Sequence, residues 1–208
     1  MPGPDKRREL AADEMSERHF TRLLKSVVVP RPIAWVSTTS AGGVDNLAPH
    51  SFFTVASQVP PVVQFTSIGR KDSLRNAIDT GEFVVNLADL GNLEAINASG
   101  TAYPPDEDEF EALGIAREES AVVSAPRVAG SPVAIECRTK GTVEFEESVV
   151  VFGQVVHLAI SESVMDGDHP EITKLAPMAR LGKNEWSEIG TIHRIDRIDL
   201  DQAKRTGD

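Results

Sequence analysis

A chain of 208 residues that is 40% hydrophobic and 25% charged has the size and composition of one globular domain. Its formal net charge of -11 argues against a general nucleic-acid binder and against a protein of anionic membrane surfaces. No run approaches the roughly 20 apolar residues that a membrane span needs, and the charged start lacks the apolar core of a secretory signal. One cysteine, Cys137, excludes an internal disulfide, so we expect a cytoplasmic protein in which Cys137 is a packed core thiol.

Strand-like segments dominate the chain. After a charged N-terminal part, with a short helix expected around Arg8–His19, apolar and β-branched runs alternate with Gly and Pro turns. Ser40–Gly43 is predicted to be a hairpin turn, and Pro49 suits an edge strand or a bend. The predicted strands are Ile33–Thr39, Val44–Leu47, Ser51–Ser57, Val62–Ser67, Glu82–Ala88, Pro132–Glu146 and Ser148–Ile160.

The few predicted helices are short. Asp72 or Ser73 is expected to cap one that ends at Gly81, and Leu93–Ser99 is predicted to form another. The acidic segment Tyr103–Glu111 is expected to be a solvent-facing loop. Many strands with few helices predict a mainly β fold, a closed or nearly closed antiparallel barrel. We expect residues 1–19 to form a charged extension or short helix, 20–198 the domain, and 199–208 a polar tail.

A polar loop follows the strand Val62–Ser67, where the next helix begins. A helix start supplies free amides and the positive end of the helix dipole, which favours a phosphate or another anion. In this loop Arg70 and Lys71 bring positive charge, while Ser67 and Ser73 bring hydroxyls. Asp72 would repel a phosphate, so we interpret it as a helix cap or as an orienter of Lys71. The alternative is an ordinary solvated turn with no ligand.

Several common catalytic patterns are absent from the sequence. There is no G-x-G-x-x-G after a strand, no P-loop, no G-x-S-x-G and no H-E-x-x-H motif. The five histidines are far apart and form no i, i+4 pair, so no metal site is predicted.

The chain resembles the flavin reductase-like, FMN-binding split-barrel family over about residues 20–197. The resemblance rests on a set of motifs in a specific order. They are Arg31–Thr38, Asn46–Phe53, Pro60–Pro61, Arg70–Ser73 and Gly81–Asn86, followed by Gly153–His157 and Ala179–Gly182. It implies an antiparallel, Greek-key-like split barrel, a homodimer with FMN at the interface, and NADH or NADPH as hydride donor.

The resemblance also implies roles for particular residues. The ring of FMN would contact the segment around Pro49, and its phosphate would contact the polar loop. His157 is the tentative catalytic residue, although a buried or edge histidine is an equal alternative, and His50 is expected to point away because adjacent strand side chains alternate. The expected cofactor-binding residues are Asn46, Leu47, Ala48, Pro49, Ser51, Ser67, Arg70, Lys71, Asp72, Ser73, His157 and Arg180.

Three functions follow from this resemblance. The first is an FMN-dependent NAD(P)H:flavin reductase, in which the flavin carries the chemistry. The second is a non-catalytic FMN electron carrier or a flavin-supplying partner of a monooxygenase. The third uses the same barrel for another ligand, such as haem or pyridoxal phosphate, which the spaced donor set makes less favourable.

Overall fold

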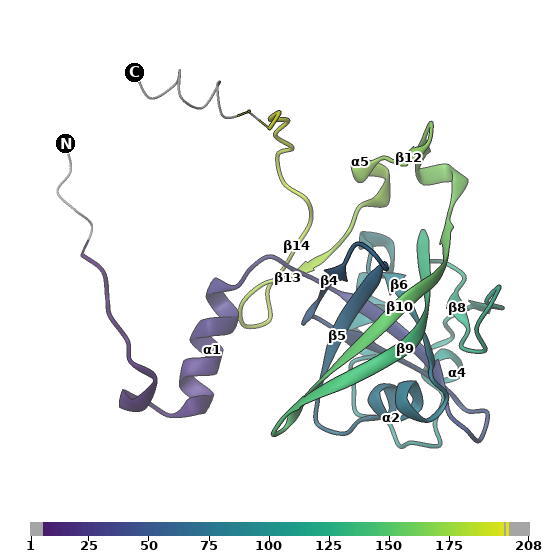
Figure 1. Cartoon of the computed structure of the whole chain (residues 1–208), viewed down its shortest axis with the longest axis horizontal. Coiled ribbons are helices and arrows are strands. Elements are labelled where there is room, and N and C mark those ends of the chain that lie inside the picture. Colours follow the sequence, from purple (N-terminus) through teal and green to yellow (C-terminus); the bar gives the residue numbers. More distant parts are fainter. Residues whose placement is uncertain (1–5, 198, 200–208) are drawn as a thin grey trace.

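The computed structural model describes residues 6–197 and 199, and a seven-stranded sheet forms its centre (Figure 1). The strand order is β3-β2-β6-β9-β10-β5-β4, and every neighbouring pair is antiparallel. The bounds are β2 Ala34–Thr39, β3 Asp45–His50, β4 Phe53–Ser57, β5 Val62–Ile68, β6 Glu82–Leu87, β9 Val133–Phe145 and β10 Ser148–Ile160. The two edge strands, β3 and β4, are joined by residues 51–52, so the sheet curls into the predicted split barrel.

Residue alternation along the strands builds two hydrophobic cores. Ala34 and Val36 of β2 face the barrel interior, and Trp35 between them joins a second core against the outer helices. Pro49 lies within the edge strand β3. An edge strand accommodates proline because the missing N–H leaves no hydrogen bond to a neighbouring strand unmade. Cys137 is fully buried in the inner core, and this burial raises the pKa of its thiol to about 12. The prediction of a packed core thiol is confirmed.

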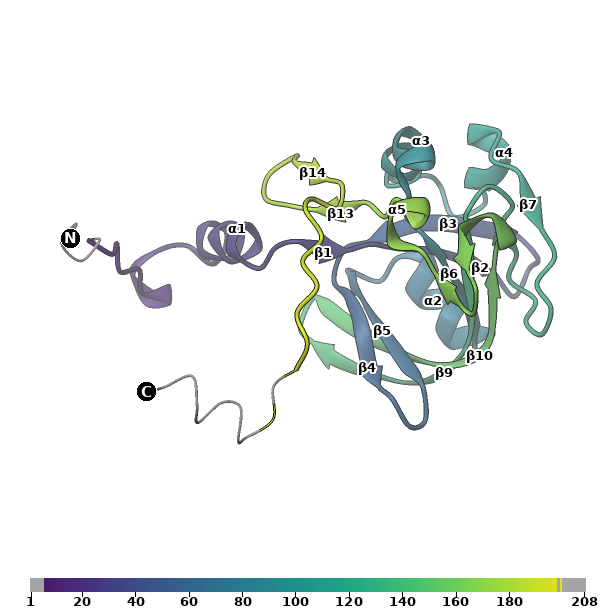
Figure 2. The ribbon, with the colours of Figure 1, turned by 90° about the horizontal axis from the view of Figure 1, so that it is seen from above.

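The helices lie outside the sheet or close one end of the barrel, as two views at right angles show (Figure 1, Figure 2). Their bounds are α1 Glu17–Val27, α2 Asp72–Asp79, α3 Leu93–Ala98, α4 Glu109–Leu113 and α5 Ile172–Leu175, with 3-10 turns at Ala12–Glu14, Leu90–Asn92 and Glu162–Val164. The helix expected around Arg8–His19 begins later than predicted. Ser16 caps it by accepting from the His19 N–H, and the helix continues to Val27.

The acidic segment was predicted as a solvent-facing loop, and this is wrong at its C-terminal end. Asp108 caps α4 by accepting from the Phe110 N–H. Phe110 then enters the outer core, and Glu109 is buried beside β3. Charge alone predicts solvent exposure, but the partners of Glu109 lie 62 and 63 residues earlier in the chain, at Leu47 and Asn46.

Three small sheets complete the fold. They are β1 (Arg31–Pro32) with β13 (Ala179–Arg180) and β14 (Trp186–Ser187), β7 (Arg117–Glu118) with β8 (Arg127–Val128), and β11 (Met165–Asp166) with β12 (His169–Pro170). The antiparallel register of β1 and β13 places Arg31 directly opposite Arg180. Residues from the two ends of the chain therefore meet beside the barrel.

Two segments project from the barrel, α1 before it and residues 188–197 after β14 (Figure 1, Figure 2). None of the residues of α1 is buried, and Val27 is 74% exposed. Further large apolar side chains, including Leu24, Ile189 and Ile195, are exposed on the same two segments. None of the helices in the described part of the chain is long and apolar enough to cross a membrane.

Candidate functional site

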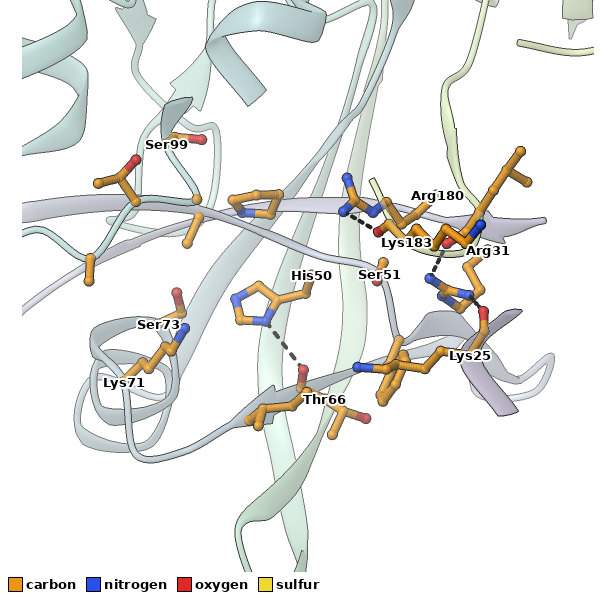
Figure 3. A pocket seen from close by; sticks show the side chains of 18 of the residues that line it. Lys25, Arg31, His50, Ser51, Thr66, Lys71, Ser73, Ser99, Arg180 and Lys183 are labelled. Atoms are coloured by element: carbon orange, nitrogen blue, oxygen red, sulfur yellow. Dashed lines mark hydrogen bonds between the residues drawn. The ribbon is translucent and has the colours of Figure 1, made fainter. Parts of the chain in front are cut away.

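A cavity of about 680 Å³ opens beside β3, between the start of α2 and the β1–β13 sheet (Figure 3). This volume lies in the range of roughly 300–1,000 Å³ that is usual for small-molecule sites. Its walls come from α1, the β3–β4 link, the end of β5, the start of α2, the segment after α3, and the β13–β14 turn. The cavity therefore collects residues from the whole length of the domain.

Most of the residues expected to bind the cofactor meet in this cavity. Those that line it are Asn46, Ala48, Pro49, Ser51, Lys71, Asp72, Ser73 and Arg180. Those that do not line it are Leu47, Ser67, Arg70 and His157.

One end of the cavity lies at the start of α2. Lys71 is the N-cap residue of this helix and lines the cavity beside Ser73 (Figure 3). Neither Asp72 nor Ser73 makes a side-chain cap, and Asp72 forms an ion pair with Arg75 instead of orienting Lys71. Among the residues that the structure describes, Lys71 has no ion-pair partner. A helix start with an unpaired cation is a favourable place for a phosphate.

Arg70 and Ser67, which were also expected at the phosphate end, do not line the cavity. Arg70 is paired with Glu144 of β9 at 3.0 Å, and its side chain is 72% exposed. Ser67 is buried, and its hydroxyl donates to the Gly69 carbonyl at 2.8 Å. It therefore shapes the loop from within, because the side chains at the end of β5 alternate between the core and the surface.

A buried polar network supports the wall formed by β3. The Asn46 amide nitrogen donates to both carboxylate oxygens of Glu109, at 2.9 and 3.0 Å, and the Leu47 N–H donates to the same carboxylate at 2.9 Å. The Asn46 oxygen accepts from Ser73 at 3.0 Å. Desolvation raises the pKa of Glu109, despite these donors. Asn46 thus ties β3 to α2 and α4, and Leu47 contributes its backbone to this network while its side chain packs in the outer core.

His157, the tentative catalytic residue, does not line the cavity. It is on β10, opposite Glu136 of β9, and its Nδ1 is 3.5 Å from the Glu136 carboxylate and 3.4 Å from Arg127. Glu136 is fully buried and accepts from Arg127 and from the amides of Ala121 and Val122. Burial alone would raise the pKa of Glu136, and these bonds hold it below its ordinary value. The side chain of His157 therefore lies beside the Arg127–Glu136 ion pair in this chain.

His50 faces the site, and the expectation that it points away is wrong. It lines the cavity and is 8% exposed, with its ring packed 4.7 Å from that of Phe65. Nδ1 lies 3.3 Å from the Thr66 carbonyl, which only accepts, so Nδ1 carries the proton (Figure 3). Nε2 is buried and has no hydrogen-bond partner among the described residues. Burial, together with the nearby Lys71, lowers the pKa of His50 to about 4.

This burial predicts a pH dependence of stability. Between pH 6.5 and pH 4 the unfolded chain binds a proton at His50 that the folded protein does not, so acidification favours unfolding. The part of the folding free energy that depends on a neutral His50 is fully present above pH 6.5. About 2 kcal/mol of it is lost by pH 5. In urea titrations, the His50→Gln variant is expected to lose less stability than the wild type between pH 7 and pH 5. Parallel losses in the two proteins would show that His50 is not the group responsible.

The opposite end of the cavity is rich in cations that were not expected there. Arg31, Lys25, Lys183 and Arg180 lie around Ser51, on the far side of His50 from Lys71 (Figure 3). Of these four residues, only Arg180 was predicted in the site. Lys25 and Lys183 belong to none of the recognised motifs. Arg31 begins one of the motifs, but it was not assigned to the site. No group of three or more His, Cys, Asp or Glu side chains suited to a metal occurs in the described residues.

The cavity fits FMN in its chemistry. One end offers an unpaired lysine and a helix start for a phosphate, and the middle offers the backbone around Pro49 and the unsatisfied Nε2 of His50. An elongated ligand with an anion at one end and several polar groups matches this order of residues.

Comparison with known proteins identifies relatives over nearly the whole chain. The family model described as "Flavin reductase like domain" matches residues 26–173. The uncharacterized protein BH2278 of Halalkalibacterium halodurans is 35% identical over 208 residues, covering 94% of this chain and 99% of that protein. The crystal structure of nitrilotriacetate monooxygenase component B from Bacillus cereus is 29% identical, with a TM-score of 0.87 and coverage of 92% and 100%. That of the 2-nitrobenzoate 2-nitroreductase NbaA from Pseudomonas fluorescens is 26% identical, with a TM-score of 0.86 and coverage of 93% and 98%.

Proposed function

Because the chain belongs to the flavin reductase-like family, we propose that it is an FMN-dependent NAD(P)H:flavin reductase. The observation that carries the proposal is the cavity at the start of α2, where Lys71 has no ion-pair partner in the described chain although the protein is acidic overall. A local cation at a helix start compensates for an unfavourable overall field when the ligand is anionic.

In this proposal Lys71 and the first amides of α2 hold the phosphate, and Ser73 adds a hydroxyl oxygen. Ala48, Pro49 and Ser51 form the wall against which the ring binds. Bound FMN would supply the redox centre, which accepts hydride from a reduced nicotinamide. The residues of the chain bind and orient both rings and exclude water, so no protein acid or base is assigned.

The proposal includes a homodimer. Isolated helices as short as α1 are marginal in water unless an apolar face packs against something. Here α1 buries none of its residues, and its Leu24 and Val27 are exposed together with Ile189 and Ile195 of the C-terminal segment. A second copy of the chain would cover both projecting segments, and because α1 also lines the cavity, it would lie beside the proposed flavin site.

The similarity to a protein named as a monooxygenase component supports a role in supplying reduced flavin to a monooxygenase. In that role the flavin product leaves the site, whereas an electron carrier would retain it.

The direct test is an anaerobic absorbance titration of the purified protein with FMN, followed by NADH and then NADPH. The expected result is a flavin spectrum that sharpens on binding and bleaches with one or both nicotinamides. Binding of FMN without bleaching would contradict the reductase and leave an electron carrier. No binding of FMN at all would overturn the flavin assignment.

A further inference from the structure

The cations at the second end of the cavity have no acidic partner among the residues that the structure describes. Arg31 and Arg180 stand directly opposite each other in the β1–β13 pair, an arrangement that is unfavourable for like charges. Lys25 of α1 and Lys183 of the β13–β14 turn line the cavity beside them. In the described part of the chain none of these four residues forms an ion pair with a carboxylate, although acidic residues outnumber basic ones by 32 to 21.

Arg31 gives the strongest indication of a missing anion, because this cation is only 8% exposed. Its terminal nitrogens donate to three neutral backbone carbonyls, those of Lys25 at 2.5 Å, Val28 at 2.9 Å and Leu181 at 2.8 Å. Its Nε is buried and has no partner among the described residues. Burial and the charge of Arg180 lower the pKa of Arg31. A buried guanidinium without an anion is costly, and a bound anion would remove that cost.

This cationic end is separate from the phosphate end. Lys71 and Ser73 lie on one side of His50, while Arg31, Lys25, Arg180 and Lys183 lie on the other side (Figure 3). FMN carries one phosphate, so it satisfies one of the two ends. The other end then stays open to a second anionic ligand.

We propose that Arg31, Arg180, Lys25 and Lys183 form a second anion subsite, which binds the diphosphate of the reduced nicotinamide dinucleotide. The assignment of the donor rests on the proposed reductase function, whereas the anion subsite itself does not. Arg31 holds the junction of α1 and β13 together, and Arg180 stacks on Trp186 with 4.9 Å from its guanidinium carbon to the ring centre. Lys25 and Lys183 are therefore the residues to change, because their side chains make no hydrogen bond or ion pair in the described structure that would be lost.

The first experiment tests the subsite without flavin. Inorganic pyrophosphate is titrated by calorimetry into the full chain carrying Lys71→Ala, which removes the cation at the other end. Adding Lys25→Ala and Lys183→Ala is expected to weaken pyrophosphate binding at least tenfold. The matched control adds Lys6→Ala and Lys140→Ala, two exposed lysines outside the cavity, and is expected to change binding less than twofold. Equal losses in the two sets, or no binding before Lys25 and Lys183 are changed, would overturn the subsite.

The second experiment identifies the ligand. In FMN-loaded protein, Lys25→Ala with Lys183→Ala is expected to raise KM for NADH at least tenfold and to leave the Kd of FMN within twofold. With 1-benzyl-1,4-dihydronicotinamide, a hydride donor without phosphate, KM is expected to stay unchanged. Equal increases for both donors would overturn the diphosphate contact.

A selective loss of affinity for FAD, or a loss for FMN, would assign the subsite to the flavin and overturn the nicotinamide assignment. Failure of the wild type to bind flavin would refute the proposed function, while the pyrophosphate titration would still decide the subsite.

Discussion

Replacing Lys71 by alanine is expected to weaken FMN binding by about ten- to a hundredfold while leaving riboflavin binding nearly unchanged. Riboflavin has the same ring and ribityl chain but no phosphate. A hydrogen bond to a charged group is worth roughly 1.5–3 kcal/mol, which corresponds to this range of affinity. Lys71 lines the cavity at the N-terminus of α2, so the loss should appear only for the ligand with the anion. Fluorescence titration of both flavins measures it.

Arg70 provides the matched control, because it is the adjacent residue and carries the same charge. Its side chain is engaged with Glu144 and lies outside the cavity. Arg70→Ala is therefore expected to change FMN affinity less than threefold, in keeping with the small effects of exposed charges. If the Arg70 variant loses as much FMN affinity as the Lys71 variant, the phosphate contact is not made by Lys71 alone. If riboflavin binding falls as much as FMN binding in the Lys71 variant, the phosphate end is placed wrongly.

Replacing Arg127 by leucine is expected to lower the free energy of unfolding by about 3–5 kcal/mol at pH 7–8, because it leaves a buried carboxylate without its cation. Glu136 is fully buried, and Arg127 donates to it through Nε at 2.9 Å and through a terminal nitrogen. Without Arg127 the pKa of Glu136 should rise, since desolvation is then less opposed. The variant should consequently be closer to the wild type at pH 5 than at pH 8. Urea unfolding at both values measures the effect.

Two further variants separate this explanation from a general packing effect. Glu136→Gln in the Arg127→Leu background removes the unpaired charge and is expected to recover part of the loss at pH 8. Arg138→Ala serves as the control, because Arg138 is exposed and lies 3.9 Å from Glu82. It is expected to change stability by less than about 1 kcal/mol. A pH-independent loss in Arg127→Leu, unaffected by the glutamine, would mean that packing and not charge dominates there.

Much of the barrel was predictable because the information is local. Alternating apolar residues and turn residues identify a strand within a few positions, and the predicted Ser148–Ile160 coincides with β10. The N-terminal helix was placed too early because charge, not the Ser16 cap, guided the prediction. Glu109 was predicted to be exposed because its partners, Asn46 and Leu47, are distant in the sequence.

The candidate site was predictable only in part for the same reason. Lys71 and Ser73 were found because a helix start is a local feature with a local charge. His157 and Arg70 do not line the cavity, because their side chains contact carboxylates of β9, those of Glu136 and Glu144. Lys25 and Lys183 carry no local signal, and only the β1–β13 pairing brings the two ends of the domain together around Arg31.

The strand content, the buried core cysteine, the family and a cation at the start of α2 could all be read from the sequence, while the role of that cation in binding a phosphate stays a prediction. These properties depend on residue periodicity and on neighbours along the chain. Only the tertiary structure decided which charges are paired and which remain unpaired, because pairing depends on strand register and on contacts between distant segments. The β1–β13 register places Arg31 opposite Arg180 at one end of the cavity, and in the described chain neither the group around Arg31 nor Lys71 at the other end is paired with a carboxylate.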